Sequence, residues 1–249
     1  MKTLRLLTCM ALIASIFSCS NDDDSCAEST FFRDADSDGL GTASESQMAC
    51  EVPDGFVSNS DDNDDTQALS PLITGTTSNL HAPQEGGQGQ PISGAFTKFD
   101  FETGQITTSD TDWDVAFRGT TIIVNGGTSQ GTIDEPSRTG NAAAYIATGT
   151  MSSITSVETS SLVQDSTTAL AIPSGSDNGW YNYAGEPTFL ITPLAGKIIV
   201  FRTTEGRYAK MEILSYYEDA PSNPDAFIDS SRYFTFNYEY QPNNNVTIF

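Results

Sequence analysis

Aspartates at alternate positions near the N-terminus carry the most specific chemical signal in the sequence. The motif reads Asp34-Ala35-Asp36-Ser37-Asp38-Gly39, and five residues separate its glycine from Glu45. This spacing fits the D-x-[DN]-x-[DN]-G-x5-E pattern of calcium-binding loops. Calcium takes about six to eight oxygen ligands, many of them anionic. The predicted ligands are the carboxylates of Asp34, Asp36 and Asp38 and the carbonyl of Leu40, with Glu45 as either a further ligand or a coincidental match.

A second acidic cluster follows at residues 61–65, which read Asp-Asp-Asn-Asp-Asp. Carboxylates packed together repel one another strongly unless a cation neutralises them. We therefore predict one calcium-binding module formed by both clusters, with Asp62, Asp64 and Asp65 as ligands from the second. The short aromatic stretch before the first loop leaves no room for the helices of an EF-hand. A solvated acidic linker is the alternative interpretation.

The first 25 residues predict export and lipid anchoring. Lys2 and Arg5 precede an apolar run, residues 6–17, that is too short to span a bilayer as a helix. A small residue directly before Cys19 is the signal at which bacterial lipoproteins are cleaved and lipidated. We predict a signal peptide over residues 1–18, a lipid on Cys19 and an acidic tether over residues 19–25. The alternative is an ordinary secretory peptide cleaved nearby.

The acidic tether also indicates in which cellular location the lipid-anchored protein would lie. Its residues 21–24, Asn-Asp-Asp-Asp, resemble the export tag of surface lipoproteins in Bacteroides-like bacteria. The predicted location is the outer membrane, with the chain facing the cell exterior.

Cysteine usage agrees with an oxidising compartment. Cys9 falls in the signal peptide and Cys19 takes the lipid, which leaves Cys26 and Cys50 as an even pair. We predict a disulfide between them. Such a bond would close a loop of about 25 residues and contribute roughly 3 kcal/mol by the loop-entropy model.

Residues 26–71 as a whole resemble calcium-binding modules of the thrombospondin type 3 and MopE kinds. The resemblance rests on residues 31–39 (FFRDADSDG), residues 49–57 (ACEVPDGFV) and the acidic cluster at residues 61–65. The sequence departs from these modules at Asn63, where they often carry a cysteine. The resemblance implies a small, irregular calcium-binding module.

Charge and residue usage exclude several classes of function. The chain has 33 acidic and 11 basic side chains and a net charge of −22, which opposes binding to nucleic acids. Its single histidine, His81, has no serine or cysteine motif beside it, although nucleophilic catalysis usually needs such a base. Nothing singles out a carboxylate pair for glycoside hydrolysis. We therefore predict a protein that is not an enzyme.

The rest of the chain predicts a mostly β domain with antiparallel sheets over residues 92–249. Residues 72–91 are rich in turn-forming residues and glycine, and they are expected to form a linker. Strands are predicted around residues 96–101, 113–124, 197–204, 207–217 and 232–240. The last three are expected to form a meander of antiparallel neighbours.

Several of these strands resemble the HmuY family. The matching stretches are TDWDVAFR and IIVNGG at residues 111–118 and 122–127, NGWY at 178–181, YAKMEI at 208–213 and YFTFNY at 233–238. The resemblance implies a mostly β surface lipoprotein that captures haem and passes it to an outer-membrane transporter.

The strand motifs of the family are present in this sequence, but most of the haem ligands that the family implies are not. The best-known member holds iron between two histidines and some relatives use two methionines, whereas this chain has only His81. Near the second ligand position the chain reads Tyr183-Ala184-Gly185. Met151 lies close to the first position, and Tyr145 could ligate iron as a phenolate. The alternative function is a calcium-stabilised surface module that binds a peptide, a glycan or a partner lipoprotein.

Overall fold

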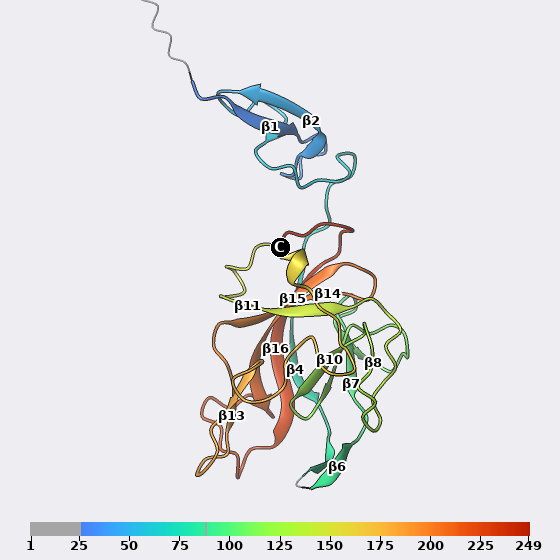
Figure 1. Ribbon diagram of the computed structural model, residues 1–249. Helices are drawn as coiled ribbons and strands as arrows, with labels where there is room; N and C mark the ends of the chain where they lie inside the picture. Colours follow the sequence, from blue (N-terminus) through green and yellow to red (C-terminus); the bar gives the residue numbers. More distant parts are fainter. Residues whose placement is uncertain (1–25, 88) are drawn as a thin grey trace, which may run out of the picture.

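The computed structural model describes residues 26–87 and 89–249, which form a small module and a larger β domain (Figure 1). The predicted signal peptide, Cys19 and the tether lie outside the described residues. Within the described residues every regular element is a strand, except for one short 3-10 helix, η1 (Thr159–Ser161). No described helix is long and apolar enough to cross a membrane.

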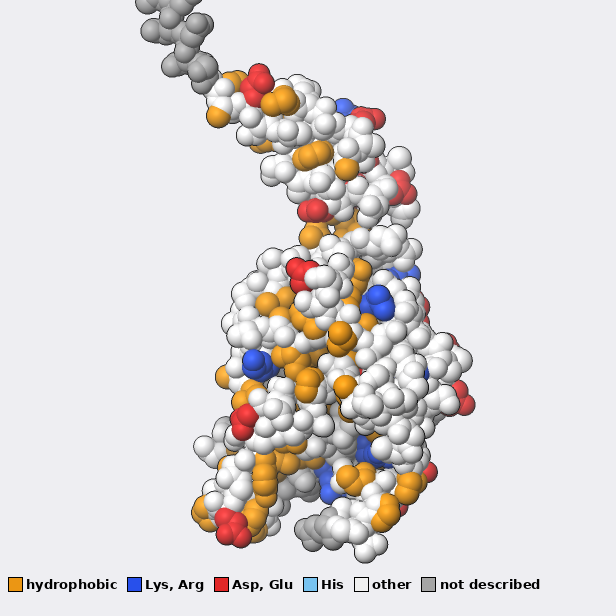
Figure 2. Space-filling model, viewed as in Figure 1, with side chains coloured by type: hydrophobic (Ala, Val, Ile, Leu, Met, Phe, Trp, Pro, Cys, Tyr) orange, Lys and Arg blue, Asp and Glu red, His pale blue; other side chains and the backbone are white. Residues whose placement is uncertain are grey.

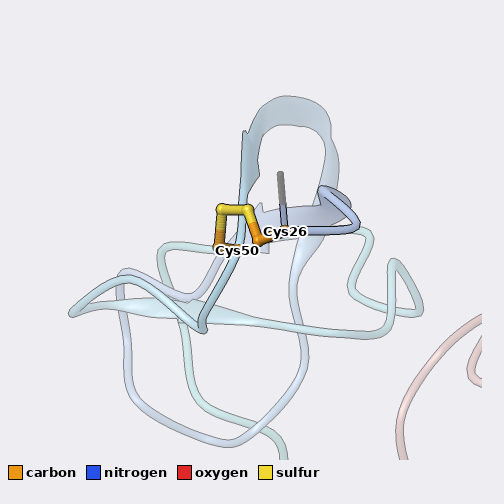
Figure 3. The surroundings of a disulfide bond; sticks show 2 residues. All are labelled: Cys26 and Cys50. Atoms are coloured by element: carbon orange, nitrogen blue, oxygen red, sulfur yellow. A yellow bond between two sulfur atoms is a disulfide. The ribbon is translucent and has the colours of Figure 1, made fainter. Parts of the chain in front are cut away.

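The small module is a three-stranded sheet with almost no apolar interior. It contains β1 (Ser29–Arg33), β2 (Thr42–Ala49) and β3 (Phe56–Val57), in the order β2-β1-β3. Phe31 is the only apolar side chain in residues 26–66 that is buried. The predicted disulfide is confirmed: Cys26 and Cys50 are bonded at the end of the β1–β2 hairpin, with their Cα atoms 5.7 Å apart (Figure 3). This disulfide compensates for the small module's lack of a hydrophobic core.

The β domain contains a five-stranded antiparallel sheet in the order β11-β14-β15-β16-β4. Its strands are β4 (Ile73–His81), β11 (Ala143–Thr148), β14 (Lys197–Arg202), β15 (Tyr208–Tyr217) and β16 (Ser231–Gln241). Strands β14, β15 and β16 pair consecutively, so the predicted meander is confirmed. The expectation of a mostly β fold with antiparallel sheets is likewise confirmed.

A second sheet of four strands covers one face of the first. Its order is β10-β9-β7-β8, with β7 (Thr97–Asp100), β8 (Gln105–Thr107), β9 (Val115–Arg118) and β10 (Thr121–Val124). Aromatic rings fill the space between the sheets: Phe99 lies 5.3 Å from Phe236, and Phe117 lies 4.9 Å from Phe234, between ring centroids. Two hairpins complete the domain, β5 (Glu85–Gly87) with β6 (Gln90–Ser93) and β12 (Tyr181–Tyr183) with β13 (Ile191–Pro193).

The expectation that residues 72–91 form a linker is wrong. Residues 73–81 form β4, which pairs with β16 along the edge of the five-stranded sheet, and β5 and part of β6 follow. Leu80 of β4 is fully buried in the main core. Threonines at 74, 76 and 77 are β-branched and suit a half-exposed edge strand, although the glycine and the serine beside them suggest turns.

The small module joins the β domain through a narrow connection (Figure 2). Hydrogen bonds of Ser70 with Asn243 help to hold this junction: the Ser70 N–H donates to Asn243 Oδ1 over 2.9 Å, and Asn243 Nδ2 donates to the Ser70 carbonyl over 2.8 Å. The Asn243 side-chain amide thus both accepts from and donates to the backbone of Ser70, in the same way that a peptide group of a neighbouring strand would.

Candidate calcium and haem sites

The first acidic motif forms a tight loop between β1 and β2. The Asp38 N–H donates to Asp34 Oδ1 at 3.2 Å, and the Gly39 N–H donates to Asp34 Oδ2 at the same distance. Gly39 has a φ of +91°, a conformation that a side chain would strain. The glycine therefore permits the sharp turn that gathers the carboxylates.

The second acidic cluster folds back onto this loop. Asp34, Asp36 and Asp65 bring carboxylate oxygens within 4.8 Å of one another, and Asp36, Asp38 and Asp62 do the same. Asp36 belongs to both groups. Five of the predicted metal ligands thus converge from two segments that are more than twenty residues apart in the sequence.

Two carboxylate oxygens in this cluster are buried without a hydrogen-bond partner. They are Asp36 Oδ2 and Asp62 Oδ2, and the Asp62 residue is only 4 % exposed. Desolvation and the nearby charges of Asp38 and Asp62 raise the pKa of Asp36. Unpaired buried carboxylate oxygens are costly, and a cation held among them would remove that cost. The donor chemistry fits calcium.

The other predicted calcium ligands lie in different environments. Asp64 Oδ1 accepts hydrogen bonds from the Thr66 hydroxyl and N–H, and Asp64 belongs to neither oxygen group. Glu45 is an exposed residue of β2 and also belongs to neither group. Leu40 follows the turn directly, where its N–H donates to Asp38 Oδ1.

Sequence reasoning missed one residue that shapes the acidic loop, Asn59. Asn59 Nδ2 donates to the Gly39 carbonyl at 2.9 Å, and Asn59 Oδ1 accepts the Gly41 N–H at 3.1 Å. This side chain therefore fastens the far end of the loop. An asparagine two residues before an acidic cluster is a weak signal, because asparagine is also common in turns.

Met151 and Tyr145, the haem candidates, lie together on the outer face of the five-stranded sheet. We call this surface the β11 patch, and its members pack around the buried side chains of Val157, Ile198 and Val200. The partly buried members are Tyr145, Ala147, Met151, Ile154, Leu162, Tyr208 and Phe249. Figure 2 shows apolar side chains gathered around β11 on this face of the domain.

A buried lysine fixes the loop that carries Met151. The Lys210 ammonium donates to the Met151 and Ile154 carbonyls at 2.6 and 2.8 Å and forms an ion pair with Glu239 at 2.9 Å. Tyr145 is less available, because its hydroxyl accepts the Glu158 N–H at 2.9 Å. Met151 is thus the better placed of the two candidates.

The β11 patch offers haem an apolar surface and one soft ligand. The cavity beside Met151 has a volume of about 270 Å³, and its other lining residues come from β4 and β16 rather than from the patch. This volume is below the roughly 300–1,000 Å³ of most enclosed small-molecule sites, so haem would have to lie across the patch. A methionine thioether is an established haem ligand. The residues present fit a haem held by one axial ligand from this chain.

Met151 and Tyr183 do not share a site. The Met151 carbonyl bonds to Lys210, whereas Ile191, the partner of Tyr183 in the β12–β13 hairpin, donates its N–H to the Tyr217 hydroxyl. Lys210 and Tyr217 are seven residues apart on β15, a distance of about 23 Å at roughly 3.3 Å per residue. The two positions are therefore held near opposite ends of β15.

His81 lies away from both candidate sites. It ends β4, and its ring stacks on Tyr233 of β16 at 4.5 Å between centroids. Strand pairing places these two residues directly opposite each other. The histidine therefore has an ordinary structural environment.

The β domain matches a known protein family. The family model described as HmuY protein matches residues 94–238, more than half of the chain. The chain belongs to the HmuY family. The match includes β7 to β15 and most of β16, and it excludes the small acidic module.

Solved structures of HmuY-like proteins are only distantly similar. The apo HmuY analogue of Tannerella forsythia has 14 % identity and a TM-score of 0.44, and the match covers 71 % of this chain and all of that one. A candidate HmuY-like haem-binding protein of Bacteroides vulgatus has 12 % identity and a TM-score of 0.35, with 69 % and 93 % covered. A candidate lipoprotein of Bacteroides fragilis has 15 % identity and a TM-score of 0.37, with 69 % and 90 % covered. No curated protein matches the sequence.

Proposed function

We propose that this HmuY family member is a calcium-stabilised lipoprotein of the cell surface that binds haem or a related tetrapyrrole for nutrient acquisition. The β domain would hold the ligand on the β11 patch, with Met151 as the axial ligand. A lipid on Cys19 would anchor the chain in the outer membrane, and an outer-membrane transporter would receive the ligand. The role is binding rather than catalysis.

The observation that carries the haem proposal is the combination of the family match with the β11 patch. Haem is a flat, mostly apolar ligand, and this patch presents apolar side chains beside a half-buried methionine. Apolar surface on a monomer often marks a place where another molecule binds. A spectroscopic titration with haemin tests this proposal, because an iron ligand from the protein would shift the Soret band.

The calcium proposal rests on the buried, unpaired Oδ2 atoms of Asp36 and Asp62. Calcium bound at Asp34, Asp36, Asp38, Asp62 and Asp65 would neutralise five carboxylates and link the two halves of the module. Extracellular calcium modules bind in the range of ~0.1–1 mM. We therefore expect saturation of this module in millimolar calcium.

Matched asparagine variants test the calcium site. We expect Asp62→Asn to weaken calcium binding by roughly tenfold or more, because the substitution removes one anionic ligand from a buried position. The control is Asp61→Asn, which removes the same charge from the exposed neighbouring residue. Isothermal titration calorimetry of calcium-free protein measures both. Equal affinities for the two variants, or no heat for the parent protein in millimolar calcium, would contradict the site.

A second candidate function, binding of a peptide, a glycan or a partner lipoprotein, is favoured by an exposed aromatic tip. Phe227 and Ile228 are 72 % and 80 % exposed, and the Phe227 ring contacts the Phe189 ring at 5.7 Å. A cavity of about 340 Å³ lies between their two loops. Retention on a column of immobilised partner that is lost in Phe227→Ser would support this function. Identical retention of the two proteins would argue against it.

A further inference from the structure

A further cavity lies on the outer face of the four-stranded sheet, away from the acidic loop and the β11 patch. Its volume is about 390 Å³, within the roughly 300–1,000 Å³ of small-molecule sites. Strands β6, β9 and β10 contribute to its lining, together with the loop at residues 130–135 and the segment at residues 170–174. Strands β6 and β10 are both visible in the lower part of Figure 1.

The cavity combines apolar walls with one buried cation. Ile123 and Phe96 belong to a small cluster of buried apolar side chains, and Leu170 packs against them. Arg118 of β9 is only 4 % exposed and also lines the cavity. Its guanidinium lies over the Phe96 ring, 4.2 Å from the centroid. Charged side chains are rarely buried this deeply without a partner of opposite charge.

Arg118 has no carboxylate partner among the described residues. Its three hydrogen bonds reach the Gly94 and Ile133 carbonyls and the Thr132 hydroxyl. A guanidinium has about five N–H donors, so these bonds leave two of them unused. One unused donor is Nε, which is buried and unpaired.

The acidic side chains around this cavity are already engaged elsewhere. Glu135 accepts hydrogen bonds from Gln130, from Thr132 and from the Arg138 guanidinium at 2.8 Å. Asp134 accepts the Gly94 N–H at 2.9 Å. Both carboxylates act on Arg118 only through longer-range attraction. The positive charge of Arg118 therefore has no direct counter-ion.

We propose that this cavity binds a small organic carboxylate with an apolar body. The carboxylate would pair with the unused Nη2 donor of Arg118, because a guanidinium N–H forms a strong, charge-assisted hydrogen bond to a carboxylate oxygen. The apolar body would pack against Ile123, Ile133 and Leu170. This site is independent of haem and of calcium.

Three small ligands distinguish the contribution of the carboxylate to binding from that of the apolar body. Octanoate carries both features, octanol lacks the carboxylate, and acetate lacks the body. We expect calorimetry on the calcium-loaded chain to show saturable octanoate binding, with octanol and acetate weaker by about tenfold or more. Equal binding of octanoate and octanol, or no octanoate heat in the millimolar range, would overturn the proposal.

Three variants locate the binding. Arg118→Gln removes the cation, and Ser174→Trp fills the cavity from an exposed position that leaves Arg118 in place. Arg202→Gln is the control, because it removes the same charge from β14, where the side chain bonds to Asn141. We expect the first two variants to lose octanoate binding and the control to keep it. Full affinity in Ser174→Trp would place octanoate elsewhere and refute the site, even if Arg118→Gln fails to fold.

Discussion

Asp114 is a buried carboxylate that should set the pH dependence of the β domain's stability. It is 1 % exposed, and its two oxygens accept N–H groups from Phe101 at 2.9 Å and Thr204 at 2.7 Å. Burial nevertheless outweighs these hydrogen bonds and raises the pKa of Asp114 to about 7. The folded domain therefore binds this proton more tightly than the unfolded chain does.

The sign of the effect follows from proton linkage. Between about pH 4 and pH 7 the folded state holds more protons than the unfolded state, so stability falls as the pH rises through this window. A pKa near 7 against an unfolded value of 3.8 corresponds to a loss of about 4 kcal/mol, complete above pH 7. Denaturant titrations at a series of pH values, read by the fluorescence of Trp113 and Trp180, would measure it.

Substitution of this single carboxylate tests the assignment. Asp114→Asn cannot ionise, and we expect its stability to vary much less between pH 4 and 7. The exposed neighbour gives the control, Asp112→Asn, which should keep the full slope of the parent protein. If Asp114→Asn and the parent protein lose stability in parallel, another group is responsible.

The Cys26–Cys50 disulfide compensates for the hydrophobic core that the small module lacks. It ties the chain before β1 to the end of β2, and only Phe31 is buried between these strands and their surroundings. We expect the double variant Cys26→Ser, Cys50→Ser to destabilise this module by about 3 kcal/mol. Limited proteolysis in calcium, followed by mass spectrometry, should then show cleavage within residues 26–66 and an intact β domain. Equal resistance of both proteins would show that calcium alone holds the module.

Long strands with alternating side chains could be predicted from the sequence, but shorter and more polar strands could not. The strands at the C-terminal end were predicted because their aromatic residues alternate, as in Phe234, Phe236 and Tyr238 of β16. The run at residues 113–124 predicts one strand, whereas the structure has a turn at Gly119 that divides it into the β9–β10 hairpin. Strand β4 was missed because its position at a sheet edge allows a polar, threonine-rich sequence.

Some residues of the candidate sites could likewise be predicted from the sequence, and others could not. Asp34, Asp36 and Asp38 follow one another in a single loop, so their local spacing was enough to predict them. Arg118 was missed, because a single basic residue at the end of an apolar strand usually reaches solvent. Its burial depends on loops at residues 94 and 132–133, which no local pattern brings together.

Along the chain, the small module lies between the predicted lipid anchor and the HmuY domain. Its acidic side chains contribute much of the net charge of −22, and like charges close together favour an extended, poorly packed chain unless cations bind. Asp38 Oδ2 also accepts the N–H of Leu69 at 2.9 Å, directly before the Ser70–Asn243 junction. In our account, calcium gives this module a fixed shape and holds the β domain away from the membrane.

A haemin titration of the mature chain in millimolar calcium, read in the visible spectrum, tests whether this protein captures haem. We predict a saturable Soret shift with micromolar or tighter affinity that is lost or weakened by about tenfold or more in Met151→Ala. Met48→Ala, at an exposed position in the small module, should bind haemin as the parent protein does. A parent spectrum that stays that of free haemin would contradict haem capture by this chain. A Soret shift that is unchanged in Met151→Ala would contradict the assignment of its ligand.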